Sequence, residues 1–81
     1  MNDGIYVVVA DIDKKEHFVE TYLNVKTYES IRKNRIEEDS SLKFQSVFST
    51  YKEAAREAKR LSKPTYVKGW KYNEERNETY R

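Results

Sequence analysis

Two groups of side chains in this sequence are of types that can carry out chemistry. His17 is the one histidine of the chain, and Asp11, Asp13 and Glu16 form a carboxylate cluster just before it. A catalytic histidine needs a nucleophile and an orienting partner, and a calcium loop needs more oxygen ligands at fixed spacing and a glycine at its bend. Neither set is identifiable here. We therefore interpret His17 as a surface or capping residue and the carboxylates as a solvated turn, and we expect no metal, no cofactor and no enzymatic activity.

A third group of side chains is the basic, aromatic segment at residues 51–72. It holds seven Lys and Arg against two Glu, a net charge of +5, whereas residues 1–25 carry two Lys against five acids, a net −3. Such charge separation steers a domain toward an anionic partner, and rings between cations can stack on nucleic-acid bases. Core packing of Tyr66 and Trp70 is the competing interpretation, since a small domain needs aromatic area inside. The predicted partner-binding residues are Arg56, Lys59, Arg60, Lys63, Lys68, Trp70, Lys71 and Tyr72.

The composition is typical of a small folded domain with a heavily charged surface. The chain has 81 residues, of which 37% are charged, but its net charge is only +2 and its aromatic content of 14% exceeds that of disordered chains. This length allows one modest core, and with no cysteine there is no disulfide to support it. No segment approaches the roughly 20 apolar residues of a membrane span, and the N-terminus lacks a signal-peptide pattern. We expect a cytoplasmic protein without a membrane contact.

Hydrophobic spacing predicts the strands that would position these side chains. The apolar run at 5–10 predicts a strand that is covered on both faces or central in the sheet, and a second strand at 17–25 follows it as an antiparallel hairpin. In a third strand at 42–49, Leu42, Phe44 and Phe48 are expected on one face, with Ser46 breaking the apolar series. A last strand is predicted at 65–72.

Helix signals differ in strength along the chain. Thr50 and Glu53 form a capping box that predicts a helix over about 51–62, which Pro64 prevents from continuing. Residues 26–41 allow two interpretations, a short helix capped by Thr27 or an extended strand end followed by a charged loop. The expected fold is α+β, a small antiparallel sheet of three to four strands with one main helix packed on one face. Residues 1–73 are expected to form this single domain, and 74–81 a polar C-terminal tail that frays or forms a short helix.

The passage Phe48-Ser49-Thr50-Tyr51-Lys52-Glu53-Ala54-Ala55-Arg56 resembles the strand-to-helix passage of plant ethylene-response-type DNA-binding domains and of phage integrase arm-binding domains. The resemblance covers about nine residues and implies a three-stranded antiparallel sheet that packs on one helix and reads the DNA major groove. In those domains the first two strands carry the arginines and tryptophans that contact DNA. Here the first strand has no basic residue and the second carries Glu20.

Two hypotheses of function follow. The first is a small protein-binding module, because tyrosine and tryptophan are favoured interface anchors; the Lys-, Asn-, Glu- and Tyr-rich makeup resembles small phage proteins that bind and inhibit a host protein of replication, transcription or defence. The alternative is a nucleic-acid-binding domain that uses the segment 51–72. Homodimerisation is compatible with both, through the strands at 6–10 and 65–72 if these lie at sheet edges.

Overall fold

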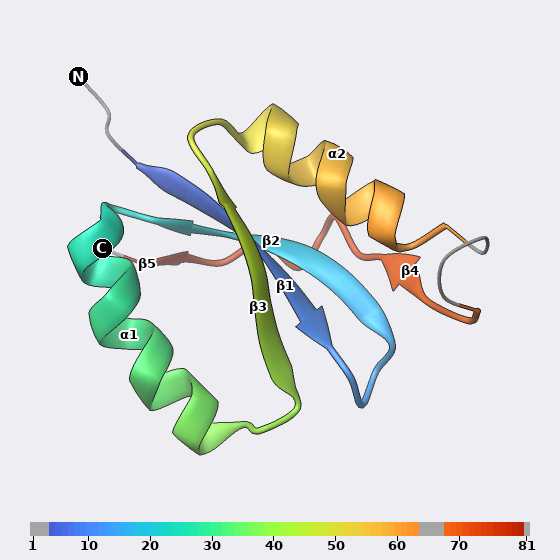
Figure 1. The fold of residues 1–81 in the computed structure, drawn as a ribbon, viewed down its shortest axis with the longest axis horizontal. Coiled ribbons are helices and arrows are strands. Elements are labelled where there is room, and N and C mark those ends of the chain that lie inside the picture. Colours follow the sequence, from blue (N-terminus) through green and yellow to red (C-terminus); the bar gives the residue numbers. More distant parts are fainter. Residues whose placement is uncertain (1–3, 64–67, 81) are drawn as a thin grey trace.

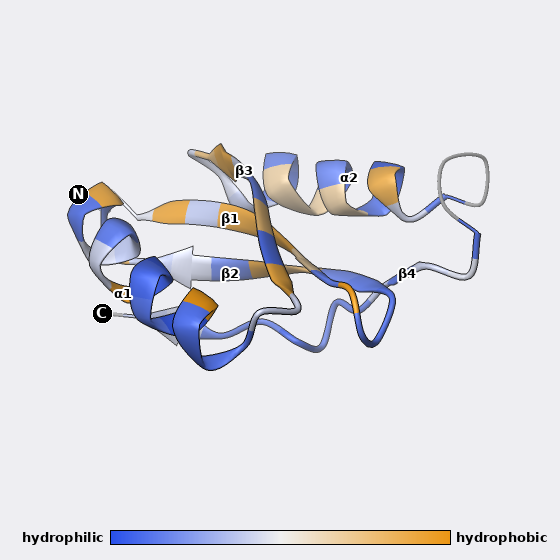
Figure 2. Cartoon of the chain, turned by 60° about the horizontal axis from the view of Figure 1, so that its bottom comes forward, coloured by the Kyte–Doolittle hydropathy of each residue, from blue (hydrophilic) through white to orange (hydrophobic). Residues whose placement is uncertain are grey.

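The structure is a computed structural model, and it describes residues 4–63 and 68–80. It shows an α+β domain in which two helices cover opposite faces of a mostly antiparallel sheet (Figure 1; Figure 2). The predicted fold class is confirmed, and a second helix is added to the main one. The elements in order are β1 (Ile5–Asp11), β2 (Glu16–Tyr22), α1 (Val25–Glu38), β3 (Leu42–Phe48), α2 (Tyr51–Leu61), β4 (Lys71–Tyr72) and β5 (Thr79–Tyr80).

β1 is the central strand of the sheet, as its unbroken apolar run predicts. It pairs antiparallel with β2 on one side and with β3 on the other. Val7 and Val9 pack with Phe18 on the face that α1 covers, and Val8 packs with Val19 on the face that α2 covers. Each such fully buried side chain contributes about 1.5–3 kcal/mol. Because both edges of β1 are paired, the expectation that the strand at 6–10 pairs with a second copy is wrong.

A β-bulge in β3 changes which face its side chains occupy. Consecutive residues of β1 pair with Phe44 and Ser46, so Gln45 is the extra residue of the bulge. Leu42 and Phe44 therefore lie in the core on the α1 side, whereas Phe48 lies in the core on the α2 side. The prediction that these three side chains share one face is wrong, because an extra residue inverts the alternation beyond it.

α2 begins and ends where the sequence predicts. The Glu53 backbone N–H donates to Thr50 Oγ1 at 3.2 Å, and the Thr50 hydroxyl donates to Glu53 Oε1 at 2.8 Å. The Glu53 carboxylate thus contacts the Thr50 side chain, whereas in a standard capping box it would accept from the Thr50 backbone N–H. Ala54 and Ala58 are fully buried against the sheet. Ser62 is the C-terminal cap. Small alanines let the helix lie close to the strands, as their spacing indicates.

α1 occupies the segment that the sequence left open between helix and loop. Its N-cap is Asn24, whose side chain accepts from the Thr27 backbone N–H at 2.8 Å, so Thr27 is not the cap. None of its residues is fully buried, and it packs on the sheet through Tyr28, Ile31 and Arg35. A helix that contacts the sheet through so few apolar side chains shows little hydrophobic periodicity in its sequence. Neither α1 nor α2 combines the length and hydrophobicity that crossing a membrane requires.

The C-terminal residues form the second edge of the sheet. Lys71–Tyr72 pairs parallel with the start of β2, and Thr79–Tyr80 pairs parallel with its end. Of the strand predicted at 65–72, only the last two residues, Lys71 and Tyr72, are found as a strand, and 65–67 lie outside the described residues. The expectation that the last residues fray or form a helix is wrong for 74–80, since Tyr80 stacks on Tyr22 with ring centroids 5.0 Å apart.

Candidate binding surface

Four cations lie along one side of α2 and its C-terminal end. Lys52, Arg56, Lys59 and Lys63 are three or four positions apart, the spacing that places helical residues on one side. All four are exposed, and none of them takes part in an ion pair within the described part of the chain. The Lys63 N–H donates to the Arg60 carbonyl at 3.3 Å, which continues the helical turn past the cap. We call these four residues the basic stripe.

Two tyrosines lie beside the basic stripe. A shallow hollow of about 370 Å³ is lined by Tyr51 and Ala55 together with three stripe residues. The Tyr72 hydroxyl from β4 is 3.1 Å from the Tyr51 hydroxyl, and Lys59 Nζ lies 5.8 Å from the centroid of the Tyr72 ring. Burial and the Tyr51 hydroxyl raise the pKa of Tyr72, so it stays a neutral phenol. The surface therefore combines flexible cations with aromatic rings that are held in place.

The structure divides the predicted binding residues into separate groups. Arg56, Lys59 and Lys63 belong to the basic stripe, with Tyr72 next to them. Arg60 is four positions after Arg56 and borders the stripe, but its Nε and Nη2 each donate to Glu57 at 2.7 Å, so it is held in a pair within α2. Tyr51 and Lys52 were not among the predicted residues, although the spacing of Lys52 from Arg56 is a signal that the sequence offers.

The remaining predicted residues lie away from the stripe. Lys71 precedes Tyr72 in β4, and successive strand residues point to opposite faces, so Lys71 is on the other face of the sheet. Lys68 is exposed in a turn with Gly69, whose φ of +79° favours glycine. Trp70 is half-buried and packs on His17 with ring centroids 4.8 Å apart. This contact agrees with the core interpretation of Trp70, and Tyr66 lies outside the described residues.

His17 is buried, so its interpretation as a surface or capping residue is wrong. Only 4% of it is exposed, and its Nδ1 lies 2.8 Å from Ser62 Oγ. The Ser62 hydroxyl donates to the Ala58 carbonyl at 2.8 Å. Its proton is thus engaged, and the His17 ring must donate Nδ1–H to Ser62. A general base would need the reverse arrangement, so this contact is structural. Burial lowers the pKa of His17, which favours the neutral ring.

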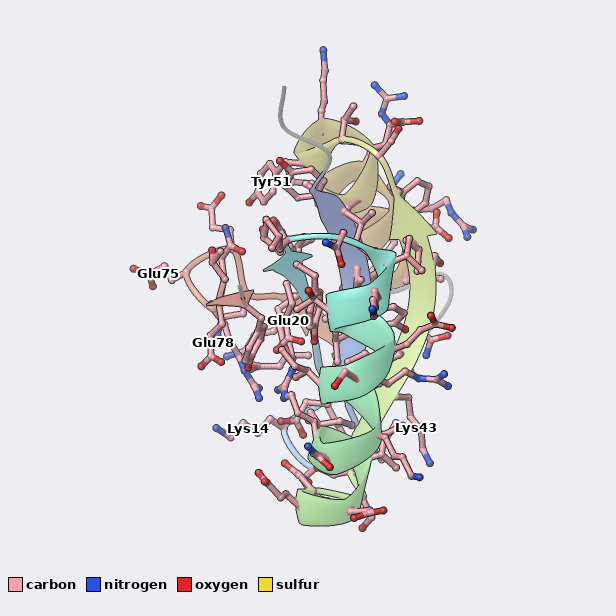
Figure 3. All side chains as sticks on the ribbon, turned by 90° about the vertical axis from the view of Figure 1, so that its left-hand side faces the viewer. Lys14, Glu20, Lys43, Tyr51, Glu75 and Glu78 are labelled. Atoms are coloured by element: carbon pink, nitrogen blue, oxygen red, sulfur yellow. The ribbon has the colours of Figure 1, made fainter. Side chains whose placement is uncertain are left out.

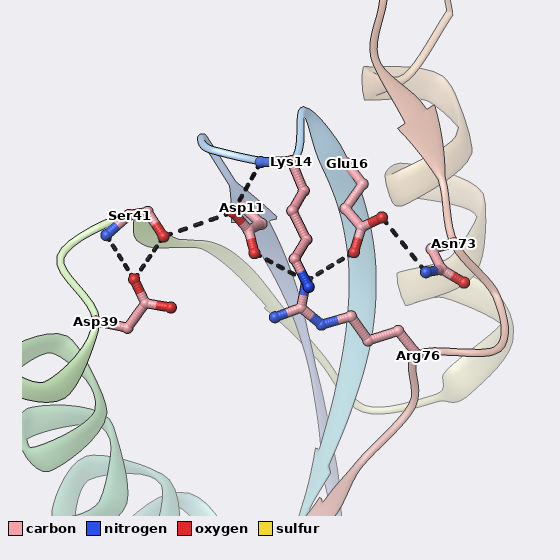
Figure 4. A network of polar contacts seen from close by, with 7 residues as sticks. All are labelled: Asp11, Lys14, Glu16, Asp39, Ser41, Asn73 and Arg76. Carbon is pink, nitrogen blue, oxygen red and sulfur yellow. Dashed lines mark hydrogen bonds and ion pairs between the residues drawn. The ribbon is translucent and has the colours of Figure 1, made fainter.

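Asp11 and Glu16 are also buried, so their interpretation as part of a solvated turn is wrong. Arg76 Nη1 lies 2.9 Å from Asp11 Oδ2 and 2.6 Å from Glu16 Oε2, bridging both carboxylates (Figure 4). Burial raises the pKa of Asp11, but hydrogen bonds from Arg76 and the Lys14 backbone N–H bring it below its usual value. Among the described residues, no group of three or more carboxylates and histidines could hold a metal ion.

A third buried carboxylate fastens α1 to the sheet. Glu20 is fully buried between α1 and the C-terminal segment (Figure 3), where its Oε1 accepts from Arg35 and, at 2.8 Å, from the Tyr22 hydroxyl. Its Oε2 has no hydrogen-bond partner among the described residues. Burial raises the pKa of Glu20, and the charge of Glu78 adds to this, against the opposing effect of Tyr22 and Arg35.

These buried carboxylates occupy the sheet face that would be expected to contact DNA. In the domains that the 48–56 passage resembles, the sheet reads the major groove. Here α1 covers the face opposite α2, and Glu20 and the Asp11–Glu16 pair lie on it. Comparison with protein-family models, curated proteins and solved structures gave no significant match. The exposed side of α2 is therefore the surface on which a function can be argued.

Proposed function

We propose that this domain is a binding module that recognises an acidic surface of a partner protein through the basic stripe. The observation that carries this proposal is the separation of charge around α2. The stripe residues share one side without an ion pair in the described structure, whereas Glu53, Glu57 and Arg60 lie on the adjacent part of the exposed surface, where Glu57 and Arg60 pair. Charges that served only for solubility would need no such separation.

The dimensions of the stripe suit a protein partner. From Lys52 to Lys63 the stripe extends roughly 17 Å at 1.5 Å per helical residue. A patch of this length fits within the area that each partner buries in a standard protein interface. Exposed cations steer an acidic partner into an encounter. Tyr51 and Tyr72 then supply amphipathic rings of the kind that anchor interfaces. The mutual hydroxyl contact of 3.1 Å reduces the entropy that the rings lose on binding.

A nucleic acid is the second candidate partner. The same four cations could contact phosphates, and the ring of Tyr51, a residue that is 38% exposed, could stack on a base. The protein partner is favoured because Glu53 and Glu57 on α2 would repel a phosphate backbone that wraps the helix. The net charge of +2 is also low for a nucleic-acid binder.

The test compares two variants of equal net charge. The stripe variant carries Lys52→Gln, Arg56→Gln and Lys59→Gln, and the control carries Lys14→Gln, Lys33→Gln and Lys43→Gln, all exposed and outside α2. Both lose three positive charges, so they differ only in where these are lost. We expect proteins captured from a bacterial lysate by the wild type to be retained by the control and lost by the stripe variant. Equal capture by both variants would contradict the proposal.

A gel shift distinguishes the nucleic-acid alternative. At about 50 mM salt a phosphate-binding stripe of four cations should shift DNA or RNA at micromolar protein, with an affinity that falls steeply as salt rises. No shift under these conditions would remove this candidate. The predictions that the partner is a host protein of replication, transcription or defence, and that the domain has no enzymatic activity, stay predictions from composition and motif.

A further inference from the structure

The hollow beside the basic stripe has the layout of a hole in helix-to-helix packing. Lys52, Ala55, Arg56 and Lys59, which line it, stand at positions i, i+3, i+4 and i+7 of α2 and are therefore neighbours on the helix surface. Four neighbouring side chains of one helix form the hole into which a facing helix inserts a single side chain, the knob. Ala55 creates the depression, because its side chain is one methyl group among three long ones.

The base and one wall of this hollow are held in place. Ala55 is only 8% exposed, because α2 packs closely on the sheet. The Tyr51 ring, which forms a wall, makes an edge-on contact with the Tyr6 ring at 6.1 Å between centroids, and its hydroxyl contacts that of Tyr72. No described segment of the chain lies over the side of α2 that faces away from the sheet (Figure 2). The hole is therefore preformed and open to a partner.

The charges around the hole define the chemistry of its occupant. Lys52, Arg56 and Lys59 take part in no ion pair within the described residues. Their aliphatic stems offer apolar contact to a knob, while their charged ends stay in water at the rim. Acidic side chains three or four positions before and after the knob on a partner helix would reach these charged ends. Coiled coils place charges around their apolar core positions in the same way.

We infer that the hollow receives one large apolar side chain from an acidic helix of the partner protein. The inference rests on the proposed function and specifies the partner segment, a helix with an apolar knob between glutamates or aspartates. A helix surrounds its knob with side chains on both sides, as the cations around Ala55 require, whereas a strand presents the side chains of one face in a single row. The stripe of roughly 17 Å matches about three turns of such a helix.

The test titrates three synthetic peptides into the whole chain and follows its backbone amides by NMR. The first is an alanine-based peptide of about 15 residues, long enough to form a helix in water, with a central leucine and glutamates three and four positions to either side. The second has alanine in place of leucine, and the third keeps leucine and the glutamates but has two prolines that prevent a helix. We expect saturable shifts at Ala55 and Lys59 with a Kd on the order of 0.1–1 mM for the first peptide, and about three- to tenfold weaker binding of the other two.

A variant of the protein localises the knob. Ala55→Met fills the hole without changing a charge, so it should remove the preference for the leucine peptide over the alanine peptide. Ile36→Met, a change at an exposed apolar residue of α1, should keep that preference. If Ala55→Met does not fold, the peptide comparison on the wild type decides alone.

Three outcomes would overturn the inference. Equal binding of the leucine and alanine peptides would show that the hollow takes no knob, while charge recognition by the stripe would stand. Equal binding of the proline peptide would show that the occupant is not a helix. The absence of a saturable shift with all three peptides would also reject the acidic helix, and the stripe proposal would then be decided by the capture experiment with its two variants of equal charge.

Discussion

Arg76 donates to Asp11 across 65 positions of the sequence, at a distance of 2.9 Å. The same guanidinium reaches Glu16 and lies 3.9 Å from the centroid of the Phe18 ring. Around it, Ser41 contacts Asp11 at 3.5 Å and Asn73 donates to Glu16 at 3.3 Å (Figure 4). One side chain from the C-terminal segment thus closes the first hairpin and neutralises two buried carboxylates.

The first prediction concerns the loss of that cation. Arg76→Gln leaves the carboxylates of Asp11 and Glu16 buried without a counter-charge, and removing one partner of a buried ion pair costs about 3–5 kcal/mol. Because 24% of the Arg76 side chain is exposed, we expect about 2–3 kcal/mol less free energy of unfolding, measured by urea denaturation. Arg60→Gln is the control, since the Arg60–Glu57 pair has 45% of the arginine side chain exposed and should cost less than about 1 kcal/mol. Equal losses in the two variants would contradict the assigned role.

The second prediction concerns the buried contact between Glu20 and Arg35. Arg35→Met leaves the Glu20 carboxylate, which is 0% exposed, without its cation, and we expect a loss of about 3 kcal/mol in the free energy of unfolding. Adding Glu20→Gln removes the unpaired charge, so the double variant should recover more than half of that loss. Urea denaturation of the two single variants and the double variant completes the cycle. Additive losses would show that the two side chains do not interact.

The third prediction concerns pH and the single histidine. Burial lowers the pKa of His17 below the 6.5 of an unfolded chain, so the unfolded state binds a proton that the folded state resists. The stability that neutral His17 contributes is present above pH 6.5 and is lost as pH falls through the folded pKa. Between pH 7.5 and about 5, the wild type should therefore lose free energy of unfolding relative to His17→Phe. Glu20, whose pKa is raised, opposes this trend but is present in both proteins. Parallel pH curves would refute the prediction.

The fourth prediction concerns the start of α1. Asn24→Ala removes the side-chain acceptor of the Thr27 N–H and should cost about 1 kcal/mol of unfolding free energy. Thr27→Ala keeps that N–H and should cost less than about half as much. Urea denaturation of both variants provides the comparison. A larger effect at Thr27 would restore it as the capping residue.

Local patterns in the sequence were sufficient where neighbours within a few residues decide the structure. The capping box at Thr50 places the start of α2 correctly, and the apolar run at 5–10 predicts the central position of β1. The hairpin between β1 and β2 follows from two strands and a short polar connection. In each case the conformation is decided by contacts within the segment itself, or by the amount of apolar surface that the segment must bury.

Predictions from residue spacing were wrong or incomplete where one residue, or a few contacts made by the fold, change which face a side chain occupies. One extra residue, Gln45, places Phe44 and Phe48 on opposite faces, although their spacing suggests one face. α1 lacks a clear apolar period because it contacts the sheet through only a few side chains and an ion pair. The basic stripe was recognised only in part, since Lys52 was not predicted, and Arg60, which was predicted, is paired with Glu57 in the structure.

The sequence by itself determined the α+β class, the central strand and the main helix, because those depend on local periodicity and capping. Only the tertiary structure decided which charged side chains are buried. Asp11, Glu16, Glu20 and His17 look solvent-facing in sequence, but all four are buried. Burial of a charge is acceptable only where a partner arrives to compensate it. Arg76 is 65 positions from Asp11, and Arg35 is 15 positions from Glu20 and on another element, so only the assembled fold brings each cation to its carboxylate.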